Sequence, residues 1–258
     1  MLKHKIITLF FISVIMLLAL LSFFVAIGVG YFIMVILLWF AVVFLGSSFI
    51  SSNYHVDAYC NNPLEKEKKI ALTFDDGPNE ITLLILDELK KYNVKATFFC
   101  IGINIEKHPE ILKRIINEDH IIGNHTYSHS HFFDFYRKNR VLEEIGKTDL
   151  LIKEISGKKV QFFRPPYGVT NPSIRSALEV TKHKVIGWNI RSLDGILKNE
   201  KFIFARIKKR IIPGGVVLLH NTSLHSVKVL EQLMMYLEEN EYKVVSTEEL
   251  LNIKAYEK

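Results

Sequence analysis

Hydrophobic positions in this chain form one continuous block followed by a series of short runs. No Asp, Glu, Lys or Arg occurs from Ile6 to Val56. A helix crosses the hydrocarbon core of a bilayer with about 20 residues, and the apolar block is long enough for two such helices. We therefore predict a transmembrane helical hairpin, with helices at Ile6–Ile27 and Tyr31–Phe49 and a tight turn at Gly28 and Gly30.

Beyond Lys68, short apolar runs alternate with amphipathic stretches of helical period. Strands are predicted at Lys69–Phe74, Ala96–Ile101, His120–Gly123, Val160–Arg164, Val185–Trp188, Val216–His220 and Tyr242–Val245. Helices are predicted at Ile81–Tyr92, Pro109–Glu118, Val141–Ile155, from Asn171-Pro172, at Lys201–Ile211 and at Ser226–Glu239, with a short terminal helix. Alternating strands and helices predict an α/β fold, a distorted (β/α) barrel with about seven parallel strands.

The same pattern divides the chain into three segments. Residues 1–50 are expected to form a membrane anchor, 51–67 a polar linker and 68–258 the α/β domain. The net charge is +6, and part of it flanks the hairpin, at Lys3 and Lys5 before it and at Lys66, Lys68 and Lys69 after it. Basic residues at this position attract anionic lipid headgroups, so the bilayer is an expected partner.

Charge and cysteine count exclude two other classes of site. No basic run is interleaved with aromatic residues, so no nucleic-acid partner is expected. Two cysteines are too few for a structural zinc site built on thiolates. The sidedness of the anchor stays open: basic residues at both ends of the hairpin favour the cytoplasm, whereas an extracellular substrate would require a single span or a reversed hairpin.

Polar side chains recur where the predicted strands end. They are Asp75, Asp76, His125, His129, Arg164, Asp194 and His220. A barrel would bring them to one mouth. Two histidines four residues apart can hold one metal ion when a carboxylate such as Asp76 completes the set. A site with three protein ligands and an open position is typical of hydrolytic metals, and Asp75 would stay free to take a proton.

Four segments resemble the successive motifs of one family. They are Thr73-Phe-Asp-Asp-Gly-Pro78, His125-Thr-Tyr-Ser-His129, Arg164-Pro-Pro-Tyr-Gly168 and Leu218-Leu-His220. In order and spacing they resemble the NodB-like polysaccharide deacetylases, carbohydrate esterase family four, over Lys68–Leu251. The resemblance implies a metal-dependent hydrolase that removes N-acetyl groups from the amino sugars of a glycan such as chitooligosaccharide or peptidoglycan. The metal it implies is usually zinc, with cobalt or another divalent ion as alternatives.

The resemblance also implies a role for each matching residue. Asp75 would be the base, held by Arg164; Asp76, His125 and His129 the metal ligands; His220 the acid that protonates the leaving amine; the Tyr167 N–H an oxyanion donor; and Leu218 with Trp188 the walls of the acetyl pocket.

One segment departs from the family pattern. The family places an aspartate three residues after the tryptophan, where it orients the acid histidine, but Arg191 stands there in this chain. Asp194 matches the second aspartate of that motif and is expected to take over the role. Gly195 stands where the family often has a further tryptophan. An arginine near His220 is expected to disfavour its protonated form.

Three other interpretations compete with a polysaccharide deacetylase. The first is a hydrolase of the same fold that acts on a lipid-linked sugar or a cyclic imide. The second is a catalytically silent glycan-binding relative, which the intact base, acid and ligands oppose. The third makes the membrane segment the functional part, but a hairpin without intramembrane charge offers no transport path.

Overall fold

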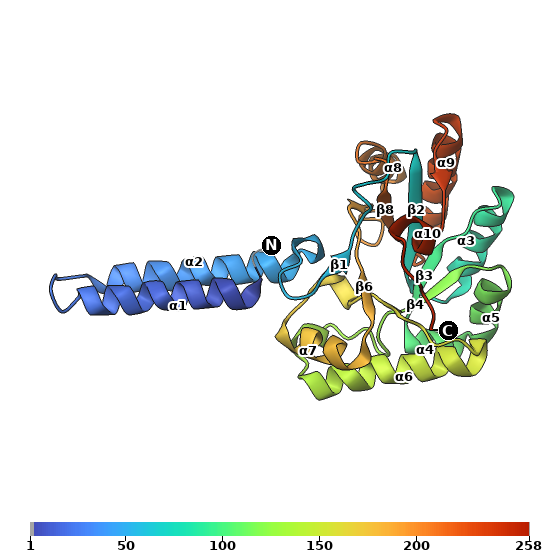
Figure 1. The fold of residues 1–258 in the computed structure, drawn as a ribbon. Helices are drawn as coiled ribbons and strands as arrows, with labels where there is room; N and C mark the ends of the chain where they lie inside the picture. The colour runs from blue at the N-terminus through green and yellow to red at the C-terminus, as the bar shows by residue number, and fades with distance from the viewer. Residues whose placement is uncertain (1–2, 258) are drawn as a thin grey trace.

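A computed structural model describes residues 3–257, so positions 1, 2 and 258 of the predicted segments lie outside it. Figure 1 shows a helical hairpin that projects from an α/β domain. The hairpin consists of α1 (His4–Leu21) and α2 (Val29–Ser48). Both helices are long and apolar enough to cross a membrane. The predicted pair is therefore present, with a broader connection, 22–28, than the tight turn expected at Gly28 and Gly30.

One parallel sheet forms the centre of the domain. Its strands are β1 (Ala58–Tyr59), β2 (Lys69–Gly77), β3 (Thr97–Cys100), β4 (Ile121–Asn124), β5 (Phe162–Phe163), β6 (Lys184–Ile186), β7 (Ile190–Arg191), β8 (Gly215–His220) and β9 (Lys243–Val244). They follow the order β1-β6-β5-β4-β3-β2-β8-β7, and β9 pairs with β2. The predicted α/β class with parallel strands is confirmed. Each of the seven predicted strands is found, and β1 and β7 are additional.

Helices connect most of the successive strands, because parallel pairing requires crossover connections. They are α3 (Glu80–Lys91), α4 (Gly102–Lys107), α5 (Pro109–Asn117), α6 (Lys138–Ser156), α7 (Pro172–Thr181), α8 (Glu200–Lys208), α9 (Leu224–Glu239) and α10 (Thr247–Leu251). Only α4 was not predicted among these. The start of α7 is as expected: Asn171 caps it by accepting from the Ile174 N–H, and Pro172 takes the first position.

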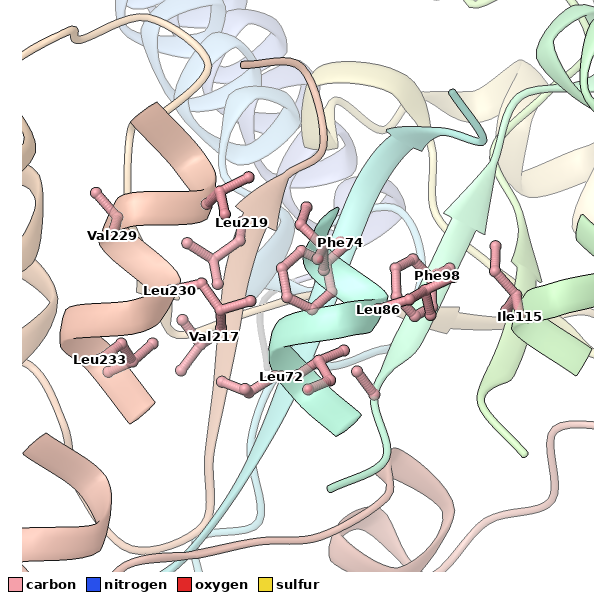
Figure 2. Close-up of a cluster of buried hydrophobic side chains, with 14 of the residues drawn as sticks. Leu72, Phe74, Leu86, Phe98, Ile115, Val217, Leu219, Val229, Leu230 and Leu233 are labelled. Atoms are coloured by element: carbon pink, nitrogen blue, oxygen red, sulfur yellow. The ribbon is translucent and has the colours of Figure 1, made fainter. Parts of the chain in front are cut away.

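The side chains of β2 point alternately into the hydrophobic core and toward the site. Leu72 and Phe74 are fully buried and pack with residues of β8, α3 and α9 (Figure 2). Successive side chains of a strand point to opposite faces, so Thr73 and Asp75 face the inside of the barrel instead. Each large apolar side chain buried in this way contributes roughly 1.5–3 kcal/mol. The packing of the outer face thus fixes the strand that carries the polar residues.

Residues 51–67, predicted as a linker, pack on the domain. In β1, Ala58 and Tyr59 pair in parallel with Val185 and Ile186 of β6. Tyr54 and Cys60 are buried. The segment has apolar residues at every second position from 54 to 60, a strand period that its polar flanks conceal. The chain between the hairpin and β2 is therefore partly a structural element of the domain.

Candidate active site

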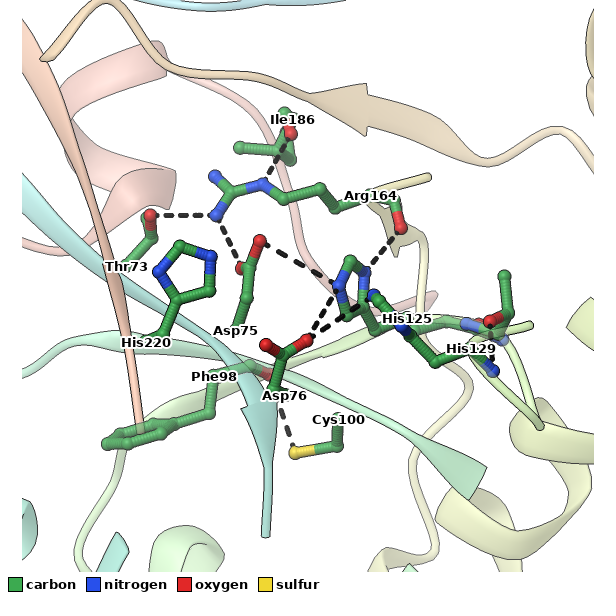
Figure 3. A network of polar contacts seen from close by, with 12 residues as sticks. Thr73, Asp75, Asp76, Phe98, Cys100, His125, His129, Arg164, Ile186 and His220 are labelled. Atoms are coloured by element: carbon green, nitrogen blue, oxygen red, sulfur yellow. Dashed lines mark hydrogen bonds and ion pairs between the residues drawn. The ribbon is translucent and has the colours of Figure 1, made fainter. Parts of the chain in front are cut away.

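At the end of β2, two adjacent aspartates both point into the mouth of the barrel. On a regular strand Asp75 and Asp76 would point to opposite faces. The pairing with β3 is instead irregular between Phe74 and Gly77, and Asp76 has a positive φ of 74°. This local distortion brings both carboxylates to the side where His125 and His129 lie (Figure 3).

Asp76, His125 and His129 form a group that fits a divalent metal. Asp76 Oδ1 lies 3.5 Å from His125 Nε2 and 3.4 Å from His129 Nε2. Bonds of about 2.1 Å in a tetrahedral site place two ligands about 3.4 Å apart. His125 Nδ1 donates to the Arg164 carbonyl at 2.7 Å, which leaves Nε2 toward the site. Burial and the neighbouring His125 lower the pKa of His129 to about 4, so its ring is neutral and can ligate.

A buried glutamate that the sequence did not single out holds the histidine loop. Glu144 of α6 is 2 % exposed and accepts from the Tyr127 and Ser128 N–H groups at 3.1 and 2.8 Å. The Ser128 hydroxyl donates to the same carboxylate. The loop needs this support because His129 has a positive φ of 46°. The sequence did contain one indication that Glu144 is buried: it stands beside Ile145 on the apolar face of a predicted helix.

A fully buried arginine holds Asp75. Arg164 Nη1 donates to Asp75 Oδ1 at 2.7 Å and to the Thr73 hydroxyl at 2.9 Å. Its other nitrogens donate to the carbonyls of Ile186 and Gly187 at 2.9 Å each. Burial lowers the pKa of Arg164, and the Asp75 charge opposes that effect. The guanidinium is thus fixed on several sides, and the Asp75 carboxylate is oriented toward the metal group.

His220, at the end of β8, is held by Asp194. The ring Nδ1 donates to Asp194 Oδ1 at 2.8 Å, and the His220 backbone N–H donates to Oδ2 at 2.9 Å. Burial lowers the pKa of His220, but the hydrogen bond and charge of Asp194, with Asp75 and Asp76, raise it to about 9. The expectation that the protonated form of His220 is disfavoured is therefore wrong, because the neighbouring carboxylates raise its pKa.

A cavity of about 210 Å³ joins these groups. Its walls include Tyr167, Trp188 and Leu218, the residues expected to contact substrate. The Tyr167 ring lies edge-on to His129, with ring centres 5.0 Å apart. Gly168, with a φ of +71°, allows close contact here, because a Cβ at that position would lie 2.4 Å from the Trp188 ring. All ten residues singled out from the sequence lie in or directly behind this cavity.

Comparison with known proteins places the domain in a family. The family model described as polysaccharide deacetylase matches residues 63–186. A peptidoglycan-N-acetylglucosamine deacetylase of Bacillus cereus is 39% identical over 64% of this chain and 60% of its own length. The peptidoglycan-N-acetylmuramic acid deacetylase PdaC of Bacillus subtilis is 35% identical over 73% of this chain and 40% of its own length. The chain thus spans less than two thirds of both curated relatives.

The match to a solved structure extends over nearly the whole of that structure's chain. The crystal structure of the Bc1960 peptidoglycan N-acetylglucosamine deacetylase matches with a TM-score of 0.72 and 33% identity, over 78% of this chain and 95% of that one. The residues matched by the family model include the strands that carry the aspartates, the histidines and Arg164. The chain belongs to the polysaccharide deacetylase family, the NodB-like esterases of carbohydrate esterase family four.

Proposed function

We propose that this protein hydrolyses the N-acetyl groups of amino sugars in a glycan, releasing acetate and leaving a free amine. The observation that carries the proposal is the convergence, in one cavity, of Asp75 held by Arg164, His220 held by Asp194, and a group of metal-binding geometry. The relatives act on peptidoglycan by name, and oligomers of its N-acetylated sugars are accordingly the first substrates to test.

Each residue has a role that its contacts support. Asp75 accepts a proton from the attacking water, and Arg164 keeps its carboxylate ionised and oriented. As the carbon–nitrogen bond breaks, His220 gives a proton from Nε2 to the leaving nitrogen, because Nδ1 is engaged by Asp194. The Tyr167 N–H is the proposed donor to the developing oxyanion. Leu218 and Trp188 enclose the acetyl methyl.

Asp76, His125 and His129 would hold a divalent cation, for which zinc is our first choice and cobalt an alternative. When bound, such a cation polarises the acetamide carbonyl and lowers the pKa of water. The free Nε2 atoms and the carboxylate form an N₂O donor set that suits zinc.

The proposal is tested with the full-length chain in detergent micelles. Acetate release from an N-acetylglucosamine tetramer should stop on treatment with a chelator and return on addition of zinc. His129→Ala should bind zinc at least about 10-fold more weakly by calorimetry, because a metal ligand is lost. Acetate release that survives complete removal of metal would contradict the proposed metal dependence.

Asp194→Asn should move the alkaline limb of the pH profile. Asp194 raises the pKa of His220, so its loss moves that pKa from about 9 toward the ordinary 6.5. Protonated His220 then disappears at lower pH, and kcat/KM falls earlier on the alkaline side. Zinc content should be unchanged, since Asp194 does not contact the three ligands. An alkaline limb at the wild-type pH would remove Asp194 from the acid step.

We also propose that residues 1–50 anchor the protein in a membrane and that 68–258 carry the activity, with 51–67 joining them. The support is the length and apolar surface of α1 and α2. After expression in a bacterial host, the chain should remain in the membrane pellet through an alkaline carbonate wash. Release into the supernatant would indicate a peripheral protein or a cleaved signal sequence.

The place of the cavity favours a second candidate substrate. Thr170, three residues beyond Tyr167, donates its N–H to the carbonyl of Ser47 at the end of α2, at 3.0 Å. The active-site loop therefore contacts the end of the proposed anchor directly. An amino sugar attached to a membrane lipid would reach such a cavity without leaving the bilayer surface.

A further inference from the structure

Arg191 presents an unpaired positive charge to the cavity. It pairs with Leu218 in the β7–β8 ladder, and neighbours in a ladder point to the same face of a sheet. Both side chains accordingly line the cavity. Ile190, one position earlier, is buried in the core on the opposite face. The strand register thus directs the arginine toward the cavity.

Every other charge of the cavity has an opposite partner. Asp75 pairs with Arg164, Asp76 with His125, and Asp194 with His220. Arg191 has no carboxylate within ion-pair distance among residues 3–257, and its Nε is buried without a hydrogen-bond partner.

The surroundings of Arg191 add positive charge. Its Cζ lies 5.7 Å from the centre of the Trp188 ring, and its backbone carbonyl accepts from Arg206 Nε at 3.0 Å. Burial, Arg210 and Arg191 lower the pKa of Arg206. The guanidinium groups of Arg191 and Arg206 are therefore close enough to repel each other, and neither forms an ion pair among residues 3–257. An anion from outside would complete this side of the cavity.

We propose that Arg191 binds an anionic group of the substrate, so that the preferred glycan carries a carboxylate or a phosphate close to its acetamido group. This inference rests on the proposed function and narrows its substrate class. A guanidinium fits both anions because its planar N–H groups form two parallel hydrogen bonds with them. The carboxylate would come from an acidic sugar of the polymer, and the phosphate from a lipid-linked sugar.

The test compares three substrates on the full-length chain in micelles. They are a neutral N-acetylglucosamine tetramer, a tetramer in which N-acetylmuramic acid alternates with N-acetylglucosamine, and N-acetylglucosamine diphosphate on a short isoprenyl chain. Arg191→Gln should lower kcat/KM for one of the anionic substrates about 10- to 100-fold more than for the neutral one, as loss of a charge-assisted hydrogen bond implies. The loss should be mainly in KM, and Arg191→Lys should recover part of it.

Arg210→Gln is the matched control, since it removes one positive charge from the same region at an exposed position outside the cavity. It should leave all three rates near wild type. The anionic substrate that loses most in Arg191→Gln identifies the source of the anion. An equal loss on all three substrates, or one confined to kcat, would overturn the inference and assign Arg191 to packing on Trp188 or to the oxyanion.

A binding measurement separates this inference from the proposed function. Calorimetry measures the binding of the same three glycans to Asp75→Asn and to the double variant Asp75→Asn/Arg191→Gln. Neither variant turns the glycans over. Weaker binding of an anionic glycan in the double variant, with neutral binding changed less, supports the anion site even if no acetate is released. Equal binding of all glycans to both variants overturns it.

Discussion

Asp75→Asn should lower the rate of acetate release by about 10²- to 10⁴-fold, the range that general-base catalysis contributes. The substitution keeps the size of the side chain and removes the group that takes the proton. Asp75 Oδ2 lies 3.8 Å from His125 Nε2, close enough to the metal group to receive a proton from water there. Initial rates of acetate release from the N-acetylglucosamine tetramer give the measurement.

The matched control is Asp149→Asn. Asp149 hydrogen-bonds Asn124 and His183 and does not line the cavity. Its substitution should change acetate release far less. Zinc binding by Asp75→Asn should stay near wild type, since the three ligands remain. A variant without Asp75 that turns over at the wild-type rate would exclude this residue as the base.

Arg164→Met should have the largest effect on stability, with a loss of about 3–5 kcal/mol in the free energy of unfolding. The guanidinium is 0 % exposed, and its removal leaves Asp75 as a buried charge without a partner. The carbonyls of Ile186 and Gly187 lose their donor as well. Urea unfolding followed by tryptophan fluorescence measures the change, because Trp188 lies beside Arg164.

Two further variants separate the buried pair from a general effect of losing an arginine. Arg175→Met breaks an exposed pair with Glu179 and should cost at most about 1 kcal/mol. Adding Asp75→Asn to Arg164→Met should recover part of the lost stability, since the uncompensated charge is gone. A loss in Arg164→Met no larger than in Arg175→Met would contradict the buried ion pair.

The sequence predicted those parts of the fold that repeat a pattern. Strands of four or more apolar residues, such as those around Phe74 and Phe98, and amphipathic helices with clear caps were found near their predicted bounds. The site residues could be listed because each follows a strand, and a parallel sheet gathers such positions at one edge.

The remaining features depend on contacts that no local pattern records. Strands β1 and β7 are two residues each, and the strand period around β1 is concealed by its polar flanks. Glu144 supports the histidine loop from a helix that begins nine residues beyond His129. The Ser192 hydroxyl, which donates to Asp194 at 2.5 Å, carries no motif of its own. These interactions depend on how separate elements meet.

The segment around Arg191 shows the limit of reading charge from sequence spacing. Arg191 and Asp194 are three positions apart, yet of the two only the aspartate is hydrogen-bonded to His220. The Arg191 side chain follows the ladder into the cavity, whereas the turn after β7, with Leu193 at a positive φ of 68°, brings Asp194 under the histidine. An arginine in place of the family's first aspartate is therefore compatible with the acid step, because Asp194 takes over the contact with His220.

Mass spectrometry of a glycan treated with the full-length chain is the most direct test of the deacetylase proposal. Incubation with zinc should convert an N-acetylglucosamine tetramer, or its muramic-acid counterpart, into products that have lost whole acetyl groups, with one free amine and one acetate for each. The sugar chain should keep its length. Intact acetyl groups on every glycan offered to the folded, zinc-loaded protein, or cleavage between the sugars, would contradict an N-deacetylase.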